Sequence, residues 1–141
     1  MITMADPVQA TGKRKSAVAR AIVKEGSGKV YINDRSLDVF DPELARLKIA
    51  EPIRLTEEVT DEIDTDEIDI EVNVSGGGFM GQADASRTAI AKALLDWSGD
   101  EELYKAFKDY DETLVKSDSR RKESKKPGGR GARKKRQKSY R

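Results

Sequence analysis

The sequence predicts an α+β fold: a small sheet with packed helices, followed by an extended basic C-terminal tail. Every second residue of segment 68–74 is Ile or Val, a period of two that is typical of a half-buried strand. In segment 83–97 apolar residues recur at helical spacing, which predicts an amphipathic helix. After Val115 the chain contains no Leu, Ile, Val or Phe, so this last segment has almost nothing to contribute to a core.

The other elements follow from local signals in chain order. Apolar residues clustered in segment 16–24 predict a first strand, 25–29 predicts a turn, and 30–32 is expected to return as the second strand of a hairpin. Asp41 followed by Pro42 predicts a helix start, and Pro52 is expected to interrupt that helix. A glycine-rich loop over 75–81 precedes the amphipathic helix, and 100–110 predicts a last short helix.

Charge divides the chain into two parts. Residues 116–141 hold 13 Lys/Arg against two acidic residues, a net charge of +11, whereas residues 1–115 hold 14 Lys/Arg against 24 Asp/Glu, a net charge of −10. We therefore expect a flexible N-terminus over 1–10, a globular domain over 11–112 and a tail over 113–141. A segment this basic and this poor in apolar residues is expected to take a shape only on a polyanion.

Composition excludes several classes of protein. The 141 residues include no Cys and no His, which removes disulfides, thiolate metal sites and the commonest catalytic base. No apolar run approaches the roughly 20 residues that span a bilayer. We expect a cytoplasmic protein with no membrane partner, no enzymatic activity, no metal and no cofactor.

The acidic segment 38–71 holds 13 Asp/Glu against three basic residues. The simplest interpretation is a solvated acidic face, and a refinement of it is adaptation to very high salt. A calcium loop is a poorer fit, because the cluster at 64–67 lacks the glycine and the distal glutamate of such a loop.

The segment 76–81, Gly-Gly-Gly-Phe-Met-Gly, satisfies the G-x-G-x-x-G pattern between a predicted strand and a predicted helix. A dinucleotide site would need a second parallel strand after the helix, and the sequence offers only a polar break and another helix. Close packing of this loop on the sheet or on RNA is the preferred interpretation, because glycine allows positive φ and close approach.

Three consecutive cations, Lys13, Arg14 and Lys15, open the first predicted strand of an otherwise acidic body. These three residues could form a solvated N-terminal arm or a clamp that binds phosphate groups, and the phosphate clamp is the favoured interpretation. Arg87 and Lys92 lie on the amphipathic helix off its apolar stripe. The sequence does not distinguish whether these two residues contact phosphate or pair with nearby acidic residues.

Three motifs taken together resemble one family. Thr-Gly-Lys-Arg-Lys-Ser-Ala-Val-Ala-Arg-Ala (11–21), Ser-Gly-Gly-Gly-Phe-Met-Gly-Gln-Ala (75–83) and Gly-Ala-Arg-Lys-Lys-Arg-Gln-Lys-Ser-Tyr-Arg (131–141) closely resemble the ninth protein of the small ribosomal subunit. The Lys-Ser-Tyr-Arg ending is similar to the archaeal and eukaryotic branch, and the acidity points to a salt-loving archaeon.

The resemblance implies a fold like the second domain of ribosomal protein S-five, with a left-handed β-α-β crossover. It also implies a place in the head of the small ribosomal subunit, beside other head proteins and bound to 16S rRNA. The family's tail reaches the anticodon stem-loop of the P-site tRNA with its terminal arginine, here Arg141. Many bacterial members end Phe-Ser-Lys-Arg, so the charge at Lys138 and the aromatic ring at Tyr140 have exchanged places.

The residues expected to bind nucleic acid fall into two sets. Those expected to bind rRNA are Lys13, Arg14, Lys15, Arg20, Arg87, Arg120, Arg121, Lys122, Lys125, Lys126, Arg130, Arg133, Lys134, Lys135 and Arg136. Those expected to bind tRNA are Lys138, Ser139, Tyr140 and Arg141. The alternative function is a free, chromatin-like module that binds nucleic acid non-specifically through its tail.

Overall fold

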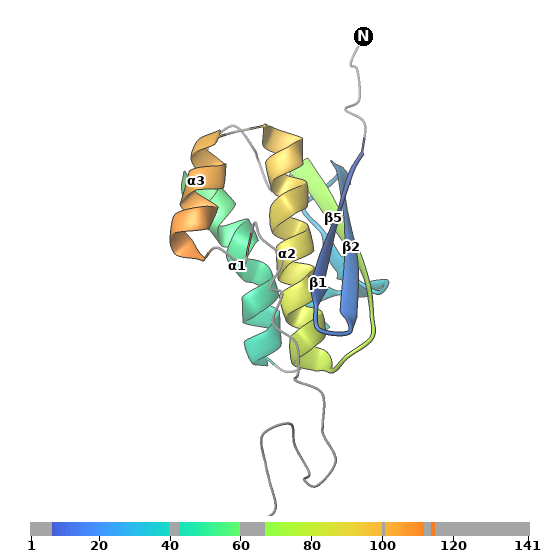
Figure 1. The fold of residues 1–141 in the computed structure, drawn as a ribbon. Helices are drawn as coiled ribbons and strands as arrows, with labels where there is room; N and C mark the ends of the chain where they lie inside the picture. The colour runs from blue at the N-terminus through green and yellow to red at the C-terminus, as the bar shows by residue number, and fades with distance from the viewer. Residues whose placement is uncertain (1–6, 40–42, 60–66, 100, 112–113, 115–141) are drawn as a thin grey trace, which may run out of the picture.

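A computed structural model describes residues 7–39, 43–59, 67–99, 101–111 and 114. These residues form a twisted sheet with three α-helices on one side of it; α2 packs directly on the strands, and α3 lies farther from the sheet (Figure 1). In chain order the elements are β1 (Val8–Arg14), β2 (Ala17–Glu25), β3 (Val30–Ile32), β4 (Arg35–Ser36), the 3-10 helix η1 (Leu37–Val39), α1 (Glu43–Val59), β5 (Ile68–Ser75), α2 (Phe79–Ser98) and α3 (Glu101–Tyr110). The predicted α+β class is confirmed.

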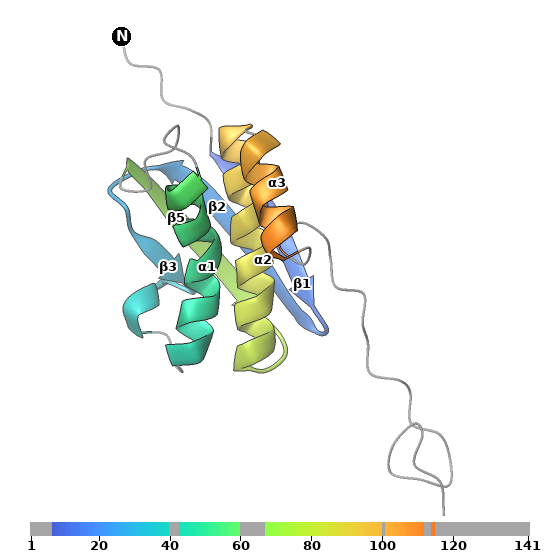
Figure 2. The same ribbon diagram turned by 90° about the vertical axis from the view of Figure 1, so that its left-hand side faces the viewer.

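The sheet has the strand order β1-β2-β5-β3-β4. Of the pairs between these strands, only β3 with β5 is parallel, and α1 connects the two. In Figure 2 the helices face the viewer, β5 runs downward to the start of α2, and β3 lies to the left of β5. The crossover is therefore left-handed, an exception to the strong right-handed preference of β-α-β units.

The predicted hairpin between 16–24 and 30–32 is wrong, although both strands exist. β2 pairs with β5 along almost its whole length, and β5 separates β2 from β3. The loop between β2 and β3 crosses the start of β5, where the Gly26 N–H donates to the carbonyl of Glu67 (2.8 Å) and the Gly28 N–H to that of Ile68 (3.1 Å). The three-residue β3 could form only a short ladder with β2, whereas the eight-residue β5 forms a long one. β2 therefore pairs with β5, which is distant in the sequence, because more cross-strand pairs form.

Asp69 on β5 holds this loop in place. Its Oδ1 accepts hydrogen bonds from the backbone N–H groups of Ser27 (2.9 Å) and Lys29 (3.0 Å). These two bonds, with the nearby positive charge of Lys24, hold the pKa of the Asp69 carboxyl below its ordinary value of 3.8. Asp69 therefore remains an ionised acceptor at neutral pH, and its contribution to stability is lost only as the pH falls through that lowered pKa.

The strand β1 was not predicted from the sequence. β1 includes residues 8–10, which were expected to belong to a flexible N-terminus, and it pairs with β2 in register from Val8 opposite Val23 to Arg14 opposite Ala17. Gly12 explains why the strand lies so close to α2, since a Cβ at this position would come within 2.3 Å of the carbonyl oxygen of Ala85. A glycine lowers the strand signal in the sequence while permitting this close approach.

Pro52 does not interrupt α1, contrary to the prediction. The helix runs from Glu43 to Val59 with Pro52 inside it and fully buried. The missing N–H of proline costs a helical hydrogen bond. Continuing the helix past Pro52 buries Thr56 and packs Ile53 and Leu55 against the core, and the Thr56 hydroxyl donates to the carbonyl of Pro52 (2.8 Å). Burial of this face offsets the lost bond.

The body extends beyond the predicted boundary at residue 112. The Asp111 N–H donates to the carbonyl of Phe107 (2.9 Å), and the Leu114 N–H donates to the carbonyl of Asp111 (3.0 Å). Leu114 is fully buried and belongs to the hydrophobic core. Its position in the middle of a polar stretch concealed this role, because a single leucine shows no periodicity.

Leu114 therefore predicts where the chain can be shortened. A fragment of residues 1–115 should unfold cooperatively. A fragment of residues 1–112 should be less stable than it by about 3 kcal/mol of unfolding free energy, because the core lacks a buried leucine. Urea unfolding of both fragments, followed by circular dichroism, measures the difference. Equal midpoints for the two fragments would show that Leu114 contributes nothing to the core.

Candidate nucleic-acid interface

Five of the residues expected to bind rRNA lie in the described part of the chain. The other expected nucleic-acid contacts lie outside it: Arg120, Arg121, Lys122, Lys125, Lys126, Arg130, Arg133, Lys134, Lys135, Arg136, Lys138, Ser139, Tyr140 and Arg141. The structure divides the five into two groups. Lys13, Lys15 and Arg20 are exposed, whereas Arg14 is partly buried and Arg87 is buried.

Lys13 and Arg20 lie on the face of the sheet that the helices do not cover. In β1 and β2, residues facing the helices alternate with exposed residues, and the exposed set includes both cations. Register places Arg20 between Thr11 on β1 and Asn73 on β5, while Lys13 lies opposite Val18. This arrangement groups two cations with amide and hydroxyl side chains, which suits contacts to phosphate and ribose.

Asn73 was not singled out in the sequence analysis. The alternation in β5 places it on the polar face, but only the pairing of β5 with β2 brings it beside Arg20. The same face changes character toward the other end of these strands. There Lys24 donates to Glu71 (3.0 Å), and Asp69 lies opposite Lys24. Unpaired positive charge on this face is thus concentrated at the end near the β1–β2 turn.

The β1–β2 turn packs directly on the glycine-rich loop. Gly76 has φ of +80°, and a Cβ there would come within 2.3 Å of the carbonyl oxygen of Ser16. Gly77 also has a positive φ, with Ala17 and the Ser16 hydroxyl beside it. The glycines therefore bring the cationic turn against the start of α2, as the interpretation based on close packing predicted.

The start of α2 completes this basic end of the body. Its N-cap, Gly78, makes no side-chain capping bond, and the next residue, Phe79, is 56% exposed. The N-terminus of a helix carries a positive partial charge, and an exposed aromatic ring can stack on a base. The apolar periodicity predicted a helix start at 83, which placed Phe79 in the loop, whereas α2 begins at Phe79. In the described residues α2 is followed by α3, and the second parallel strand of a dinucleotide fold is not among them.

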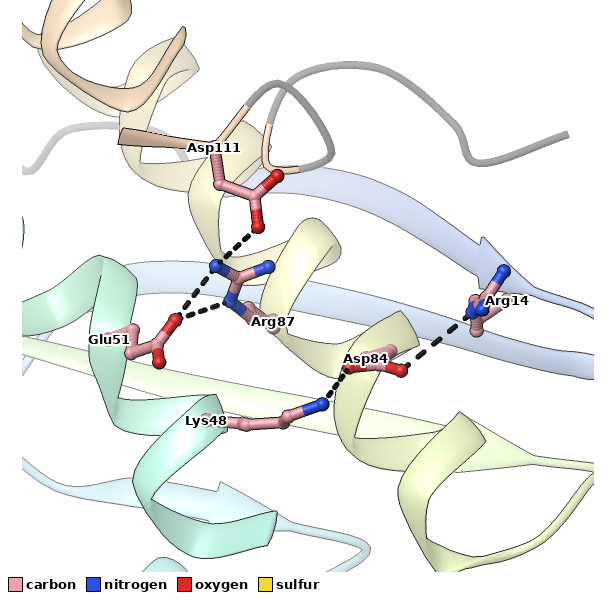
Figure 3. Close-up of polar contacts among 6 residues, drawn as sticks. All are labelled: Arg14, Lys48, Glu51, Asp84, Arg87 and Asp111. Atoms are coloured by element: carbon pink, nitrogen blue, oxygen red, sulfur yellow. Dashed lines mark hydrogen bonds and ion pairs between the residues drawn. The ribbon is translucent and has the colours of Figure 1, made fainter. Parts of the chain in front are cut away.

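Arg14 faces the helices rather than the open face of the sheet. Its Nε lies 3.7 Å from Oδ2 of Asp84 on α2, and Lys48 on α1 approaches the same carboxylate at 3.3 Å (Figure 3). The Arg14 side chain keeps only 19% of its surface exposed. The clamp of three consecutive cations is therefore split, with Lys13 and Lys15 turned to solvent and Arg14 turned inward.

Arg87 is a correction to the predicted RNA-binding set. Its guanidinium donates to Oε2 of Glu51 on α1 at 2.8 Å and to Oδ2 of Asp111 after α3 at 3.0 Å (Figure 3). The Arg87 side chain is 10% exposed. Of the two alternatives left open in the sequence, the structure favours pairing with acids, because burial of an arginine requires charged partners.

The described residues also bear on two other kinds of feature, a metal site and a membrane span. No group of three metal-ligating side chains gathers within these residues. No helix among them is long and apolar enough to cross a membrane.

The left-handed β-α-β unit and the cationic turn seated on a glycine loop define an α+β protein with one basic end. The family model for ribosomal protein S9/S16 matches residues 12–141. The chain belongs to this family, as the resemblance of its three motifs indicated.

Individual relatives agree with the family model. The chain is 50% identical over 134 residues to the small ribosomal subunit protein uS9 of Methanothrix thermoacetophila, a match that covers 95% of this chain and 98% of that one. It is 52% identical to the protein of the same name from Thermoplasma volcanium, over 96% of this chain and 99% of that one. Its identity to the uS9 of Halobacterium salinarum is 50%, over 93% and 96% respectively. All three sources are archaea, as the C-terminal ending implied.

Lys15 occupies an unfavourable backbone conformation. Its φ of +55° lies in the left-handed region, where a side chain costs about 1–2 kcal/mol and glycine costs little. Lys15→Gly should therefore leave the unfolding free energy unchanged or raise it by up to about 1 kcal/mol, while weakening RNA binding. Thermal melting and filter binding to small-subunit rRNA measure the two effects. A variant that is destabilised, or that binds RNA as well as the original chain, contradicts this prediction.

Proposed function

We propose that this chain binds the rRNA of the small ribosomal subunit with two basic elements, the end of the body around the β1–β2 turn and the C-terminal tail. Membership in the S9/S16 family establishes a structural role in the small ribosomal subunit and confirms that the chain is not an enzyme. The observation that carries the proposal is the grouping of exposed Lys13, Lys15 and Arg20 at one end of a body with a net charge of −10.

The distribution of charge favours insertion into folded RNA over binding to bulk nucleic acid. An acidic body is repelled by a continuous polyanion, whereas a protein that offers one basic end and a basic tail can leave its acidic surface facing solvent. High salt screens charges beyond about 3 Å at 1 M, so short hydrogen-bonded contacts must supply affinity under such conditions. The family assignment also removes support from the alternative of a free, chromatin-like module.

For the tail we propose passage through the RNA of the subunit head to the P-site tRNA. The 26 residues from Lys116 to Arg141 can extend for roughly 85–95 Å, which is enough to cross a large RNA fold. Arg141 then contacts the anticodon stem-loop, with Lys138, Ser139 and Tyr140 beside it. Guanidinium groups chelate phosphate with two parallel hydrogen bonds, and the ring of Tyr140 can stack on a base or ribose.

The proposed role of the body is tested by removing its two cations from the open sheet face. Lys13→Gln combined with Arg20→Gln should lower rRNA affinity by about tenfold and reduce the slope of log K against log salt by about 1 to 2. The matched control is Lys105→Gln with Lys108→Gln, two exposed lysines on α3, which is expected to bind as the original chain does. Equal losses in the two double variants would mean that only overall charge matters.

The proposed tRNA contact is tested at the end of the tail. Deletion of Arg141 should weaken P-site tRNA binding to reconstituted subunits more than Lys138→Ala does, because a guanidinium can hold phosphate through two hydrogen bonds. Filter binding of labelled tRNA ranks the two variants. Equal effects, or a larger effect of Lys138→Ala, would overturn the assignment of Arg141 as the main contact.

A further inference from the structure

Four charged residues form a ladder between α1 and α2. Lys48 and Glu51 lie three residues apart on α1, and Asp84 and Arg87 lie three residues apart on α2, so each pair shares one side of its helix. Lys48 contacts Asp84 at 3.3 Å, and Arg87 contacts Glu51 at 2.8 Å. Figure 3 shows the two rungs side by side across the contact between the helices.

Each rung of this ladder also holds one end of an element proposed to bind RNA. On the lower rung, Asp84 attracts Arg14, which immediately precedes the cationic β1–β2 turn (3.7 Å). On the upper rung, Arg87 holds Asp111 at 3.0 Å, and Asp111 lies five residues before the first basic residue of the tail, Lys116. One turn of α2 separates the two attachments.

The root of the tail is fixed by two contacts of different kinds. The Asp111 carboxylate is tied to Arg87, and three residues later Leu114 is inserted fully into the core. The Leu114 N–H also donates to the carbonyl of Asp111 (3.0 Å). A polar contact at Asp111 and an apolar anchor at Leu114 thus hold the last described residues before the tail against the body.

We propose that Asp111 is a positioning residue: through Arg87 it fixes the starting point of the tail relative to the β1–β2 turn, so that both elements engage one RNA simultaneously. This inference rests on the proposed binding of rRNA. When two binding elements are joined rigidly, the first contact raises the effective concentration of the second, provided the spacing matches. Releasing the root relaxes that spacing and exposes the tail, with its net charge of +11, to competition from the acidic body.

Glu51 supplies a matched control. Asp111→Asn and Glu51→Gln each remove one carboxylate from the same guanidinium, with the same change of charge and nearly the same volume. Both should lower stability, because each leaves the buried Arg87 with one charged partner fewer. Only Asp111 lies at the root of the tail, so only Asp111→Asn should impair the joint engagement of tail and turn.

The direction of the effect separates positioning from simple electrostatics. On charge alone, removing a carboxylate should strengthen the binding of a protein to a polyanion. We expect Asp111→Asn to weaken the affinity of the full chain for small-subunit rRNA by about three- to tenfold. Glu51→Gln should match or slightly exceed the affinity of the original chain, and Asp111→Glu, which keeps the charge, should restore binding.

The measurement is equilibrium filter binding of the full chain to the small-subunit rRNA transcript, at a temperature where circular dichroism shows every variant folded. Equal losses in Asp111→Asn and Glu51→Gln would reduce Asp111 to a structural role, and unchanged or tighter binding of Asp111→Asn would equally overturn the proposal. If the original chain itself does not bind the transcript, the proposed function fails and this inference fails with it.

A second readout follows the tail directly. The chain has no cysteine, so one engineered on α3 at Lys108 and one in the tail at Ser124 label only those two sites. On the RNA, the distance distribution between the labels should broaden in Asp111→Asn and stay narrow in Glu51→Gln. A distribution that is equally narrow in both variants contradicts the positioning role even if affinities differ.

Discussion

The structure depends on the close approach of α2 to the strands β1 and β2. Side chains at this contact are mostly alanine, and at Gly12 there is no side chain at all, since a Cβ would meet the backbone of Ala85 and of Ala89. Small residues allow the helix and the sheet backbone to pack at short range, where dispersion contacts are dense. α2 thus becomes the central element, with the sheet on one side and α1 and α3 on the other (Figure 1).

The candidate interface is a consequence of this central position. The first turn of α2 lies beneath the β1–β2 turn, where glycines at 76 and 77 let the two loops touch. Further along the helix, Asp84 and Arg87 reach outward to Arg14 and Asp111. One helix therefore supports the cationic turn at its start and receives the root of the basic tail about two turns later. α2 therefore fixes the positions of the β1–β2 turn and of the root of the tail relative to each other, although the two are far apart in the sequence.

The charge distribution is consistent with the proposed binding of rRNA. Carboxylates pair with the buried cations, and on the open face of the sheet the exposed cations lie near the β1–β2 turn. This distribution fits the proposed contacts with folded RNA and disfavours binding to bulk polyanion. The consecutive cations at 13–15 show how finely this is arranged. The pleat of β1 turns Lys13 to the open face of the sheet and Arg14 to the helices. Lys13 is therefore exposed, whereas its neighbour Arg14 pairs with Asp84.

The sequence by itself determined the fold class, the main strand β5, the presence of three helices, the family and the separation of charge, because periodicity and composition are local properties. Strand pairing and burial depend on residues that are distant in the sequence, so only the tertiary structure decided them. It placed β5 between β2 and β3 and made β1 a strand, since pairing energy is shared across the sheet. It carried α1 through Pro52, and it buried Arg87 and Leu114. Burial is a property of neighbours that the chain brings together only on folding, so charge and spacing alone could not separate a buried arginine from one that meets RNA.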